Sequence, residues 1–370
     1  MYLLKKVLNM NVMLGEVQPA DIIILDNGFS NLKFKNLKIH YYKKNNYYLI
    51  QLLKTFLDFF KFFFNRKISE IYFENLVKKV NPKIGIGHEM DEKIFLFKKF
   101  LPDKYSLGYQ HSFIFEGAIN SFYKKKFQKK ILDYYFVYDE RSKKIMSKFI
   151  KSKYLITGST KVNENLNYLN KIKKKKYDIS FVSRFRSLKN KKSNNYDLFL
   201  VRIIKEYCLR NNLKFVIIFA SKRKDKAEVS NFYEREKKFY DSAIHDYIIG
   251  NQDGLNISKQ SKLTICSNSN LGYELLYTNH KVVFFCDSNE PFKFFDKKQG
   301  SIWYNGRKSK KIEKLINKII KMSNKDWNKI NHSLNKNFKY FYRNINNFKN
   351  NLLLKKTVQK LITKQSNVRF

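Results

Sequence analysis

The stretch KLTICSNSNLGYELLYTNHKVVFF, residues 262–285, decides the fold of this chain. It begins with an apolar run typical of a buried strand and then presents residues 267–270, which are all of types that favour the amino terminus of a helix. A helical pattern with a single glutamate follows over residues 271–277, and a second apolar run comes after it. Two strands joined through a helix run parallel. The stretch therefore predicts one unit of a Rossmann-like domain.

Strand-like and helical patterns alternate along most of the chain. In the first half, apolar runs predict strands at residues 21–26, 37–42, 83–88, 105–110, 134–139 and 154–159. Helical patterns fall at residues 47–64, 69–80, 92–100 and 141–150. The alternation restarts with predicted strands at residues 177–186 and 214–221. We therefore expect the α/β class, with two Rossmann-like domains whose parallel sheets face a cleft, and a helical C-terminal tail.

A polar segment separates the two alternating series. We predict an N-terminal domain over residues 1–160 and a linker over residues 161–176, because this segment shows no apolar period and ends in the lysine-rich run KIKKKK. The second domain is predicted over residues 177–330. Helical patterns near the end of the chain predict that residues 331–370 pack back across both domains.

The chain is strongly basic. It has 370 residues, with 75 Lys and Arg against 31 Asp and Glu, and a formal net charge of +44. Such a balance favours anionic partners, for example nucleic acid or a membrane surface. The basic residues are spread along the whole length, however, and no recognition helix, zinc finger or aromatic RNA-binding motif accompanies them. We therefore expect no specific nucleic-acid partner.

Cysteine usage indicates a reducing compartment. Cys208, Cys266 and Cys286 form no CxxC pair, so the sequence predicts neither a disulfide framework nor a zinc site. The first residues lack the continuous apolar core and the small-residue cleavage site of a signal peptide. We expect a cytoplasmic protein.

One segment, YYLIQLLKTFLDFFKFFF at residues 47–64, is almost as apolar as a membrane span. Lys54, Asp58 and Lys61 interrupt it at spacings of four and three, which places them along one side of a helix. The helix is therefore amphipathic rather than spanning. It is either a core helix with one solvated polar stripe, which the pattern favours, or a helix docked on the inner face of an anionic membrane.

The strand that ends at Cys266 leads into a candidate anion site. A helix amino terminus offers unpaired N–H groups and about half a positive charge, and serine hydroxyls add donors. Gly272 would let a ligand approach the first turn, and Glu274 would accept hydrogen bonds from a ribose diol. The combination suits a nucleotide diphosphate. The simpler alternative is that Ser269 caps the helix and Glu274 supports the cap. The candidate binding residues are Ser267, Asn268, Ser269, Asn270, Gly272 and Glu274.

The predicted strand at residues 177–186 ends with a second candidate group, Ser183, Arg184 and Arg186. Guanidinium groups bind phosphate oxygens bidentately and stabilise the charge of a departing nucleotide without a metal ion. Alternate strand residues point the same way, so Arg184 and Arg186 would both face the ligand. The alternative is that these arginines belong to the generally basic surface.

Two histidines follow strand ends in the first half, His88 in IGIGHEMDE and His111 in LGYQHSFIFEG. Imidazole is the usual base for removing a hydroxyl proton near neutral pH. Either histidine could instead be structural. Glu89, Asp91 and Glu116 are less suited as bases, and Asp91 could cap the helix after it. The chain has no P-loop, HExxH, GxSxG or kinase motif, and we predict no cofactor and no metal site.

The motifs occur in a familiar order: YQH, ITGSTKVN, DISFVSRFR, SNSNLGYELL and GSIWYNG, with MSNKDW after them. In this order the chain resembles bacterial surface-carbohydrate biosynthesis transferases of GT-B type, a group similar to the CDP-glycerol glycerophosphotransferases and the capsule Kdo transferases. The resemblance spans roughly residues 21–327. It implies a GT-B-like fold in which the first domain receives the acceptor and the second holds a nucleotide-activated donor.

The resemblance also implies roles for individual residues. It gives a base role to His111, although relatives show His-Gly or Asn-Gly where this chain has His-Ser. It places donor contacts at Ser267, Ser269, Gly272 and Glu274. The loop that contains Gly300, Trp303 and Asn305 would line the donor side, or Trp303 would simply pack. Relatives have a further strand and a glycine-rich turn before residues 20–26, so the first domain is expected to be shortened.

Together these features predict a metal-independent glycosyltransferase-like enzyme. It would use a nucleotide-activated sugar or polyol phosphate to extend a glycan or lipid-linked acceptor, in capsule, O-antigen or lipopolysaccharide synthesis at the cytoplasmic membrane face. In this scheme Arg184 or Arg186 and the helix terminus hold the leaving group, while His111, or His88 in its place, deprotonates the acceptor. One alternative is a non-hydrolysing sugar-nucleotide epimerase. Another is a non-enzymatic basic module that binds anionic membrane or nucleic acid.

Overall fold

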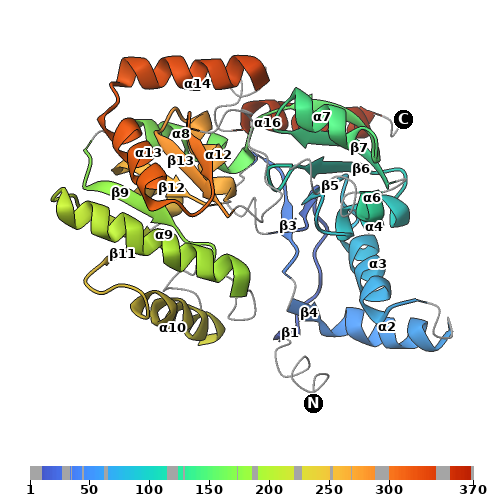
Figure 1. Cartoon of the computed structure of the whole chain (residues 1–370). Coiled ribbons are helices and arrows are strands. Elements are labelled where there is room, and N and C mark those ends of the chain that lie inside the picture. The colour runs from blue at the N-terminus through green and yellow to red at the C-terminus, as the bar shows by residue number, and fades with distance from the viewer. Residues whose placement is uncertain are drawn as a thin grey trace. The chain divides into compact units, whose positions relative to one another are not determined.

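A computed structural model shows that the chain divides into two compact units (Figure 1). The first domain comprises Met1–Asn163 together with Asn344–Phe370, and the second comprises Glu164–Arg343. The structure describes residues 11–26, 34, 36–43, 46–61, 66–114, 124–127, 130–172, 174–185, 191–220, 227–250, 253–267, 269–287, 300–338 and 351–367.

Among the described residues, the first domain contains a sheet of six parallel strands in the order β3-β2-β5-β6-β7-β8. Every residue of the short strand Ile22–Ile24 is fully buried, as expected for a central strand covered on both faces. The strands are β2 (Ile22–Ile24), β3 (Ile39–Tyr41), β5 (Ile84–His88), β6 (Tyr105–Tyr109), β7 (Lys130–Val137) and β8 (Ile150–Ile156).

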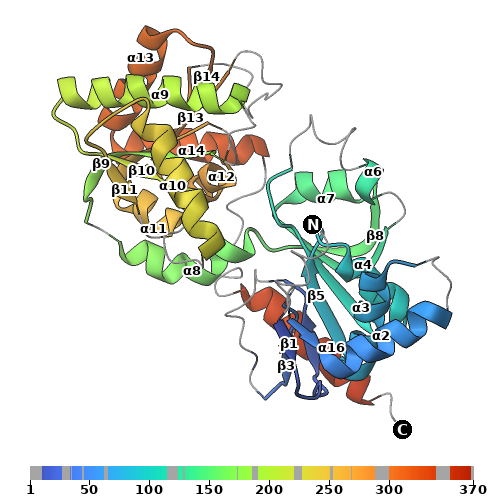
Figure 2. The ribbon, with the colours of Figure 1, turned by 90° about the horizontal axis from the view of Figure 1, so that it is seen from below.

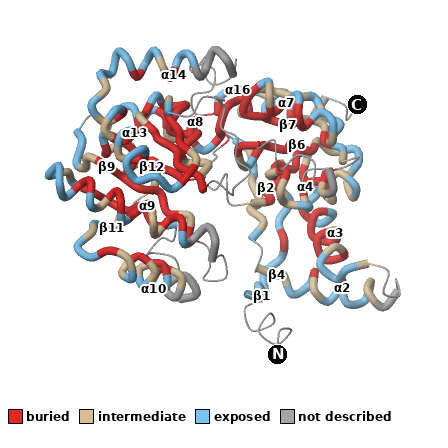
Figure 3. Tube along the Cα trace, viewed as in Figure 1, coloured by how far each residue is buried: buried red, intermediate tan, exposed pale blue. Residues whose placement is uncertain are grey.

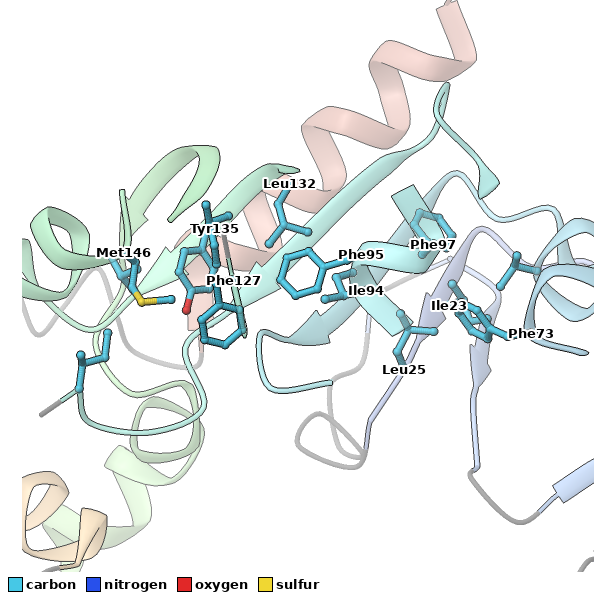
Figure 4. Packing of buried hydrophobic residues seen from close by; sticks show 14 of the residues in the cluster. Ile23, Leu25, Phe73, Ile94, Phe95, Phe97, Phe127, Leu132, Tyr135 and Met146 are labelled. Atoms are coloured by element: carbon cyan, nitrogen blue, oxygen red, sulfur yellow. The ribbon is translucent and has the colours of Figure 1, made fainter. Parts of the chain in front are cut away.

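Helices cover both faces of this sheet. On one face, α3 and α4 pack their apolar residues against Ile23 and Leu25, and Figure 4 shows Phe73, Ile94 and Phe97 in this core. On the other face, Ile22 and Ile24 share a core with residues of α16, the last helix of the chain. The helices are α2 (Leu49–Lys61), α3 (Ile68–Val80), α4 (Lys93–Phe100), α6 (Lys124–Phe127), α7 (Glu140–Met146) and α16 (Leu352–Asn367).

The second domain repeats this architecture. Its six described strands are all parallel, in the order β11-β10-β9-β12-β13-β14. Figure 2 shows α9 and α13 on one face of the sheet and α11 and α12 on the other. Figure 3 shows the central strands as largely buried, whereas the edge strand β11 is partly exposed. The strands are β9 (Tyr177–Val182), β10 (Phe215–Ile218), β11 (Ile248–Gly250), β12 (Ser261–Cys266), β13 (Val282–Cys286) and β14 (Trp303–Asn305). The helices are α9 (Lys191–Arg210), α10 (Ala227–Asp241), α11 (Gly254–Lys259), α12 (Asn270–Tyr277), α13 (Ser309–Lys321) and α14 (Asn324–Phe338).

The α/β class, the parallel sheets and the helical tail are therefore confirmed. Two short edge strands, β11 and β14, were not predicted, because three residues are too few to show a period. A further pair, β1 (Asn11–Met13) and β4 (Asn46–Tyr48), forms a separate parallel ladder in the first domain. The predicted strand at residues 177–186 ends earlier, at Val182.

The predicted linker at residues 161–176 is wrong over most of its length, because helix α8 (Thr160–Lys171) occupies it. Val162, Leu166 and Leu169 are buried at spacings of four and three, which is a helical period hidden among asparagines. The boundary between the two units falls inside this helix. The described residues of α14 belong to the second unit and α16 belongs to the first.

Helix α2 buries polar side chains and exposes apolar ones, which is the reverse of the favoured interpretation. Its buried residues include Gln51 and Thr55, and Asp58 accepts a hydrogen bond of 2.9 Å from the Asn75 side chain of α3. The exposed large side chains are Leu49, Ile50, Leu53, Phe56 and Leu57, with Leu57 65% exposed. The interpretation as a core helix with a solvated polar stripe is therefore wrong, because a polar contact with α3 turns the apolar face outward. Within the described chain, no helix combines the length and the apolar character needed to span a bilayer.

Candidate functional site

Two histidines meet at the carboxyl edge of the first sheet. His88 is the last residue of β5, and its register partner on β6 is Tyr109, two residues before His111. The two imidazole rings lie with their centroids 4.6 Å apart and their planes 35° apart. Parallel strands end at the same edge, which is why two residues separated by a whole helix come into contact.

Asp26, just after β2, supports this pair from the neighbouring strand. Its carboxylate accepts the backbone N–H of His88 at 2.9 Å and the hydroxyl of Tyr109 at 2.5 Å. Charge-assisted hydrogen bonds of this kind are stronger than neutral ones. They fix the ends of β5 and β6 relative to each other. Burial and the nearby Asp26 raise the pKa of Tyr109, so its phenol stays protonated.

Glu89, the residue after His88, carries a buried carboxyl group. It has no exposed surface, and its Oε2 accepts the backbone N–H of His111 at 2.8 Å. Its Oε1 has no hydrogen-bond partner among the described residues. Burial raises the pKa of Glu89 to about 8, although the backbone bonds act in the opposite direction. The carboxyl group is therefore mainly neutral near neutral pH.

Both imidazoles favour the neutral form. Burial lowers the pKa of His88, while Asp26 and Asp91 act to raise it. Loss of water around its ring lowers the pKa of His111, the adjacent His88 lowers it further, and Asp26 opposes both. A neutral imidazole accepts a proton, so the pair is chemically competent as a general base. His111 is exposed at the surface of its domain, whereas His88 is half-buried with no partner for Nδ1 in the described chain.

The backbone around His111 is anchored on both sides. The Gln110 side chain accepts the backbone N–H of Tyr138 at 2.8 Å and donates to the carbonyl of Ser112 at 2.8 Å. The Tyr138 hydroxyl donates to the carbonyl of His111 at 3.2 Å. These bonds hold the position of His111 without using its ring, which leaves the imidazole available for chemistry.

The remaining acidic candidates of the first domain have other positions. Asp91 accepts the backbone N–H of Lys93, the first residue of α4, at 3.0 Å and pairs with the Lys93 ammonium at 3.1 Å. The N-cap of α4 is Glu92, so Asp91 supports the start of the helix from the position before the cap. Glu116 lies outside the described residues.

In the second domain, Arg184 and Ser267 converge on a buried aspartate, Asp197 of α9. Asp197 accepts the backbone N–H of Arg184 at 3.1 Å, the Arg184 Nε at 3.3 Å and the Ser267 hydroxyl at 2.9 Å. Ser267 is fully buried and the Arg184 side chain is 12% exposed. Ser267 therefore uses its hydroxyl inside the protein, where it helps to hold the aspartate that positions the guanidinium.

Ser183 has a similar internal role. Its hydroxyl donates to Glu236 of α10 at 2.5 Å and accepts from Tyr240 at 2.9 Å. Glu236 also accepts the backbone N–H of Ala220 at 2.9 Å. The prediction that Ser183 contacts a ligand therefore has to be corrected, because its hydroxyl lies in a fully buried network. Arg186 and Asn268, two further predicted binding residues, lie outside the described residues.

Helix α12 begins at Asn270, as the sequence predicted to within a residue. Ser269 is its N-cap, and the Ser269 hydroxyl accepts the N–H of Leu271 at 3.3 Å. The simpler alternative for Ser269 is therefore confirmed. Glu274, in the second turn, is buried.

Gly272 has a packing role. A Cβ atom built there would lie 2.4 Å from the ring of Phe284 and 3.1 Å from the sulfur of Cys266. The glycine lets α12 approach β12 and β13, and its missing side chain faces the sheet rather than a ligand. The ligand-approach role is therefore wrong.

The predicted donor-side loop falls at the edge strand β14. Trp303 is 6% exposed and pairs with Phe284 in the ladder, which agrees with the packing alternative for this residue. Asn305 ends the strand. Gly300 has a φ of 93°, and no atom lies within 4 Å of its missing Cβ. Glycine is therefore favoured there by the backbone conformation, and not because a side chain would lack room.

The chain matches the family described as "putative O-antigen biosynthesis protein" over residues 114–358, about two thirds of its length. The chain belongs to this O-antigen biosynthesis family. No curated protein sequence matches it. The family match covers the whole second domain, together with residues 114–163 and 344–358 of the first.

Solved structures similar to this family member share its fold at low identity. The wall teichoic acid polymerase TagF superposes with a TM-score of 0.58 at 12% identity, covering 94% of this chain and 90% of TagF. A TagF structure soaked with CDPG gives 0.51 at 11% identity, with coverages of 96% and 88%. The UDP-GlcNAc 2-epimerase of Methanocaldococcus jannaschii, in complex with UDP-GlcNAc and UDP, gives 0.50 at 12% identity, with coverages of 92% and 99%. The fold of the family member is therefore GT-B, as the motif order implied.

Three acidic residues of these clusters escaped the sequence analysis. Asp26 ends a predicted strand at the edge where the histidines lie, and this position could have identified it. Asp197 and Glu236 lie within helices, where an acidic residue is ordinarily solvated. Their burial depends on Arg184 and Ser183, which are 13 and 53 residues away, so no local pattern marks them.

Proposed function

We propose that this protein is a metal-independent glycosyltransferase that adds a sugar or polyol phosphate from a nucleotide-activated donor to a cell-surface glycan of the capsule or O-antigen type. The observation that carries the proposal is the contact of His88 with His111 at the carboxyl edge of the first sheet. In open α/β sheets, ligands bind at this edge. Membership of an O-antigen biosynthesis family with the GT-B fold supports glycan transfer as the chemistry.

His111 is the proposed base. It takes the proton of an acceptor hydroxyl, whose oxygen then attacks the donor while the bond to the nucleotide phosphate breaks. Two observations favour His111 over His88: it is the exposed member of the pair, and its backbone is fixed by Glu89 and Tyr138. His88 lies against it and would lower its tendency to carry a charge before the acceptor binds.

The second domain is the proposed donor side. Arg184, oriented by Asp197, would stabilise the departing nucleotide phosphate, and the amino terminus of α12 would add its positive dipole end. Asn270 at that terminus and Glu274 in the next turn are the proposed donor contacts, with Glu274 on the ribose. Ser267 contributes indirectly, because it holds Asp197.

A transfer assay tests the base. Donors are first ranked by thermal-shift measurements with CMP-, CDP-, UDP- and GDP-linked compounds, since a ligand of the native state raises the melting temperature. With the best donor, His111→Ala should reduce transfer by about 10² to 10⁴-fold while donor affinity is unchanged, because the base acts on the acceptor. His332→Ala, which removes an exposed histidine of the second domain, is the matched control. Full activity of His111→Ala would reject the assignment.

The epimerase alternative retains one observation in its favour. Asp26 and Glu89 add two carboxyl groups to the histidine pair, and an epimerase of this fold requires acidic groups around the sugar. Incubation with UDP-sugars in the absence of acceptor separates the two functions, because epimerisation needs no second substrate. Formation of a C2 epimer under these conditions would replace the transferase proposal.

We also propose that α2 docks the protein on an anionic membrane surface. Its exposed stripe has the spacing of one helical face, and the chain leads into α2 from β4, whose partner β1 exposes Val12 and Met13. An exposed apolar patch of this kind marks an interaction site. The strongly basic composition complements anionic lipids, which makes a membrane the favoured partner.

Sedimentation with lipid vesicles tests this docking. Leu53→Ser combined with Leu57→Ser should weaken binding to phosphatidylglycerol vesicles by about tenfold or more, because two apolar side chains no longer insert. The matched control is Leu209→Ser combined with Ile248→Ser, which removes two exposed apolar side chains from the second domain. Equal loss in both variants would contradict a role for α2. Binding to DNA that persists in both, without binding to vesicles, would favour the nucleic-acid alternative.

A further inference from the structure

A basic cavity of about 610 Å³ lies in the second domain at the amino-terminal edge of its sheet. Its walls come from the segment before β9, the end of α11, the start of β12, the turn between α12 and β13, and the helices α13 and α14. Figure 2 labels α11, and Figure 1 labels the other elements. Ser183 and Ser267 follow the opposite ends of these strands. The cavity is therefore separate from the proposed donor site. The lining residues are Lys175, Lys259, Lys262, Thr278, Asn279, His280, Lys281, Ile320, Asn324, Trp327 and Asn328.

Four lysines line the cavity and no aspartate or glutamate does, among the residues that the structure describes. Lys262 pairs with Asp178, outside the lining, at 2.7 Å. The described partners of the other three ammonium groups are backbone carbonyls: Lys175 donates to Lys259 at 2.6 Å, Lys259 to Thr278 at 2.9 Å, and Lys281 to Met322. An ammonium group has three donors, so a single carbonyl satisfies only part of its capacity.

These ammonium groups repel one another. Burial lowers the pKa of Lys259 to about 8, and the nearby Lys175 contributes to this shift. Burial also lowers the pKa of Lys175, with a contribution from Lys281, and burial lowers that of Lys281. His280 is buried, bonded to Thr264 at 2.9 Å, and its pKa is held well below the usual value, so it adds no charge. Lys175, Lys259 and Lys281 thus place three like charges together with no carboxylate partner among the described residues, which is unfavourable unless a bound anion compensates them.

Side-chain hydrogen bonds hold the walls of the cavity in place. The Asn331 side chain of α14 donates to the Asn279 side chain at 2.7 Å and to the Leu276 carbonyl at 3.2 Å, which fixes the turn that carries Thr278 and His280. Trp327 is 2% exposed, and its indole Nε1 has no hydrogen-bond partner in the described part of the chain. The lysines therefore project from a rigid frame.

We propose that this cavity binds a phosphate group with two negative charges, such as a phosphate monoester or a diphosphate. Ammonium groups bind phosphate as point charges, and several of them around one cavity match the charge of a dianion better than that of a carboxylate. The phosphate is either that of a soluble metabolite or the headgroup of an anionic lipid, since both present the same chemistry. In either case the ligand binds at the edge of the sheet remote from the donor site.

Calorimetric titration with inorganic pyrophosphate at fixed ionic strength tests the site. Lys259→Gln combined with Lys281→Gln should weaken binding by about tenfold or more, because each substitution removes a charge-assisted hydrogen bond. The matched control, Lys310→Gln combined with Lys314→Gln, removes the same charge from exposed positions of α13 and should bind as the wild type does. Absence of pyrophosphate binding by the wild type, or equal weakening in both variants, would overturn the proposal.

Vesicles identify the source of the phosphate. Binding to phosphatidic acid over phosphatidylcholine that is lost in the cavity variant assigns a lipid headgroup, whereas unchanged vesicle binding with lost pyrophosphate affinity assigns a soluble ligand. If the variant with both Lys259→Gln and Lys281→Gln fails to fold, the site is tested in the wild type by the rate of lysine acetylation. Pyrophosphate should slow the acetylation of Lys259 and leave Lys310 unaffected. Equal acetylation of Lys259 with and without pyrophosphate would overturn the proposal.

Discussion

Replacement of Glu89 by glutamine should stabilise the first domain, and the gain should grow with pH. The ordinary pKa of a glutamate is 4.5, and burial raises that of Glu89 to about 8 in the folded protein. Between these values the unfolded chain releases a proton that the folded chain retains. The free energy of unfolding of the wild type therefore falls as the pH rises from about 4.5 to about 8.

The size of the effect follows from this window. Each pH unit costs about 1.4 kcal/mol, so the penalty is below about 1 kcal/mol at about pH 5 and about 3 kcal/mol at neutral pH. Glu89→Gln removes this penalty, since an amide does not ionise and its oxygen still accepts the N–H of His111. For a domain of this size, about 3 kcal/mol corresponds to a rise of about 6 to 12 °C in Tm. Any packing cost of the amide is the same at every pH.

Differential scanning calorimetry of wild type and Glu89→Gln over the range from about pH 5 to about pH 8 measures the difference in Tm of the first domain. The control is Glu92→Gln, which removes an exposed carboxyl three residues away and should give no pH-dependent gain. A Tm difference that stays constant with pH, or a loss of stability that grows with pH, would mean that Glu89 is ionised in the folded protein. That result would refute the argument from burial.

Two further substitutions test the second domain. Asp197→Ala should destabilise it by about 3 kcal/mol in chemical denaturation, because the backbone N–H and the guanidinium of Arg184 and the hydroxyl of Ser267 all lose their acceptor. Gly272→Ala should lower stability by about 1 to 3 kcal/mol, because the added methyl would overlap the ring of Phe284. Gly15→Ala is its control, since nothing lies within 4 Å of the missing Cβ there, and equal Tm values for both alanine variants would contradict the packing role.

The sequence by itself determined the two parallel sheets. Central strands of such sheets are covered on both faces, so they appear as continuous apolar runs such as residues 22–24 and 282–286, and this property depends only on local composition. It also placed His88 and His111 at strand ends. Because parallel strands end at one edge, their proximity was implied by the alternation of strands and helices.

Local sequence patterns gave wrong predictions where polar side chains form hydrogen bonds with residues far away in the chain. The polar side of α2 faces inward because Asp58 meets Asn75 of the next helix, so the apolar stripe points away from the core. The hydroxyl of Ser267 is occupied because Asp197, 70 residues earlier in the chain, is buried beside it. The period of apolar residues shows which side chains share one face of a helix. It does not show which face packs against a neighbouring element.

Only the tertiary structure decided the protonation state of Glu89 next to the candidate base His111. The chain shows Glu89 as one more acidic residue next to a histidine, and its neutral form follows from burial beneath the strand ends. The tertiary structure also decided that the last helix, α16, completes the core of the first domain, although the whole second domain separates them in sequence. Protonation and long-range packing depend on what surrounds a residue in space, and a period of two or 3.6 residues carries no information about that.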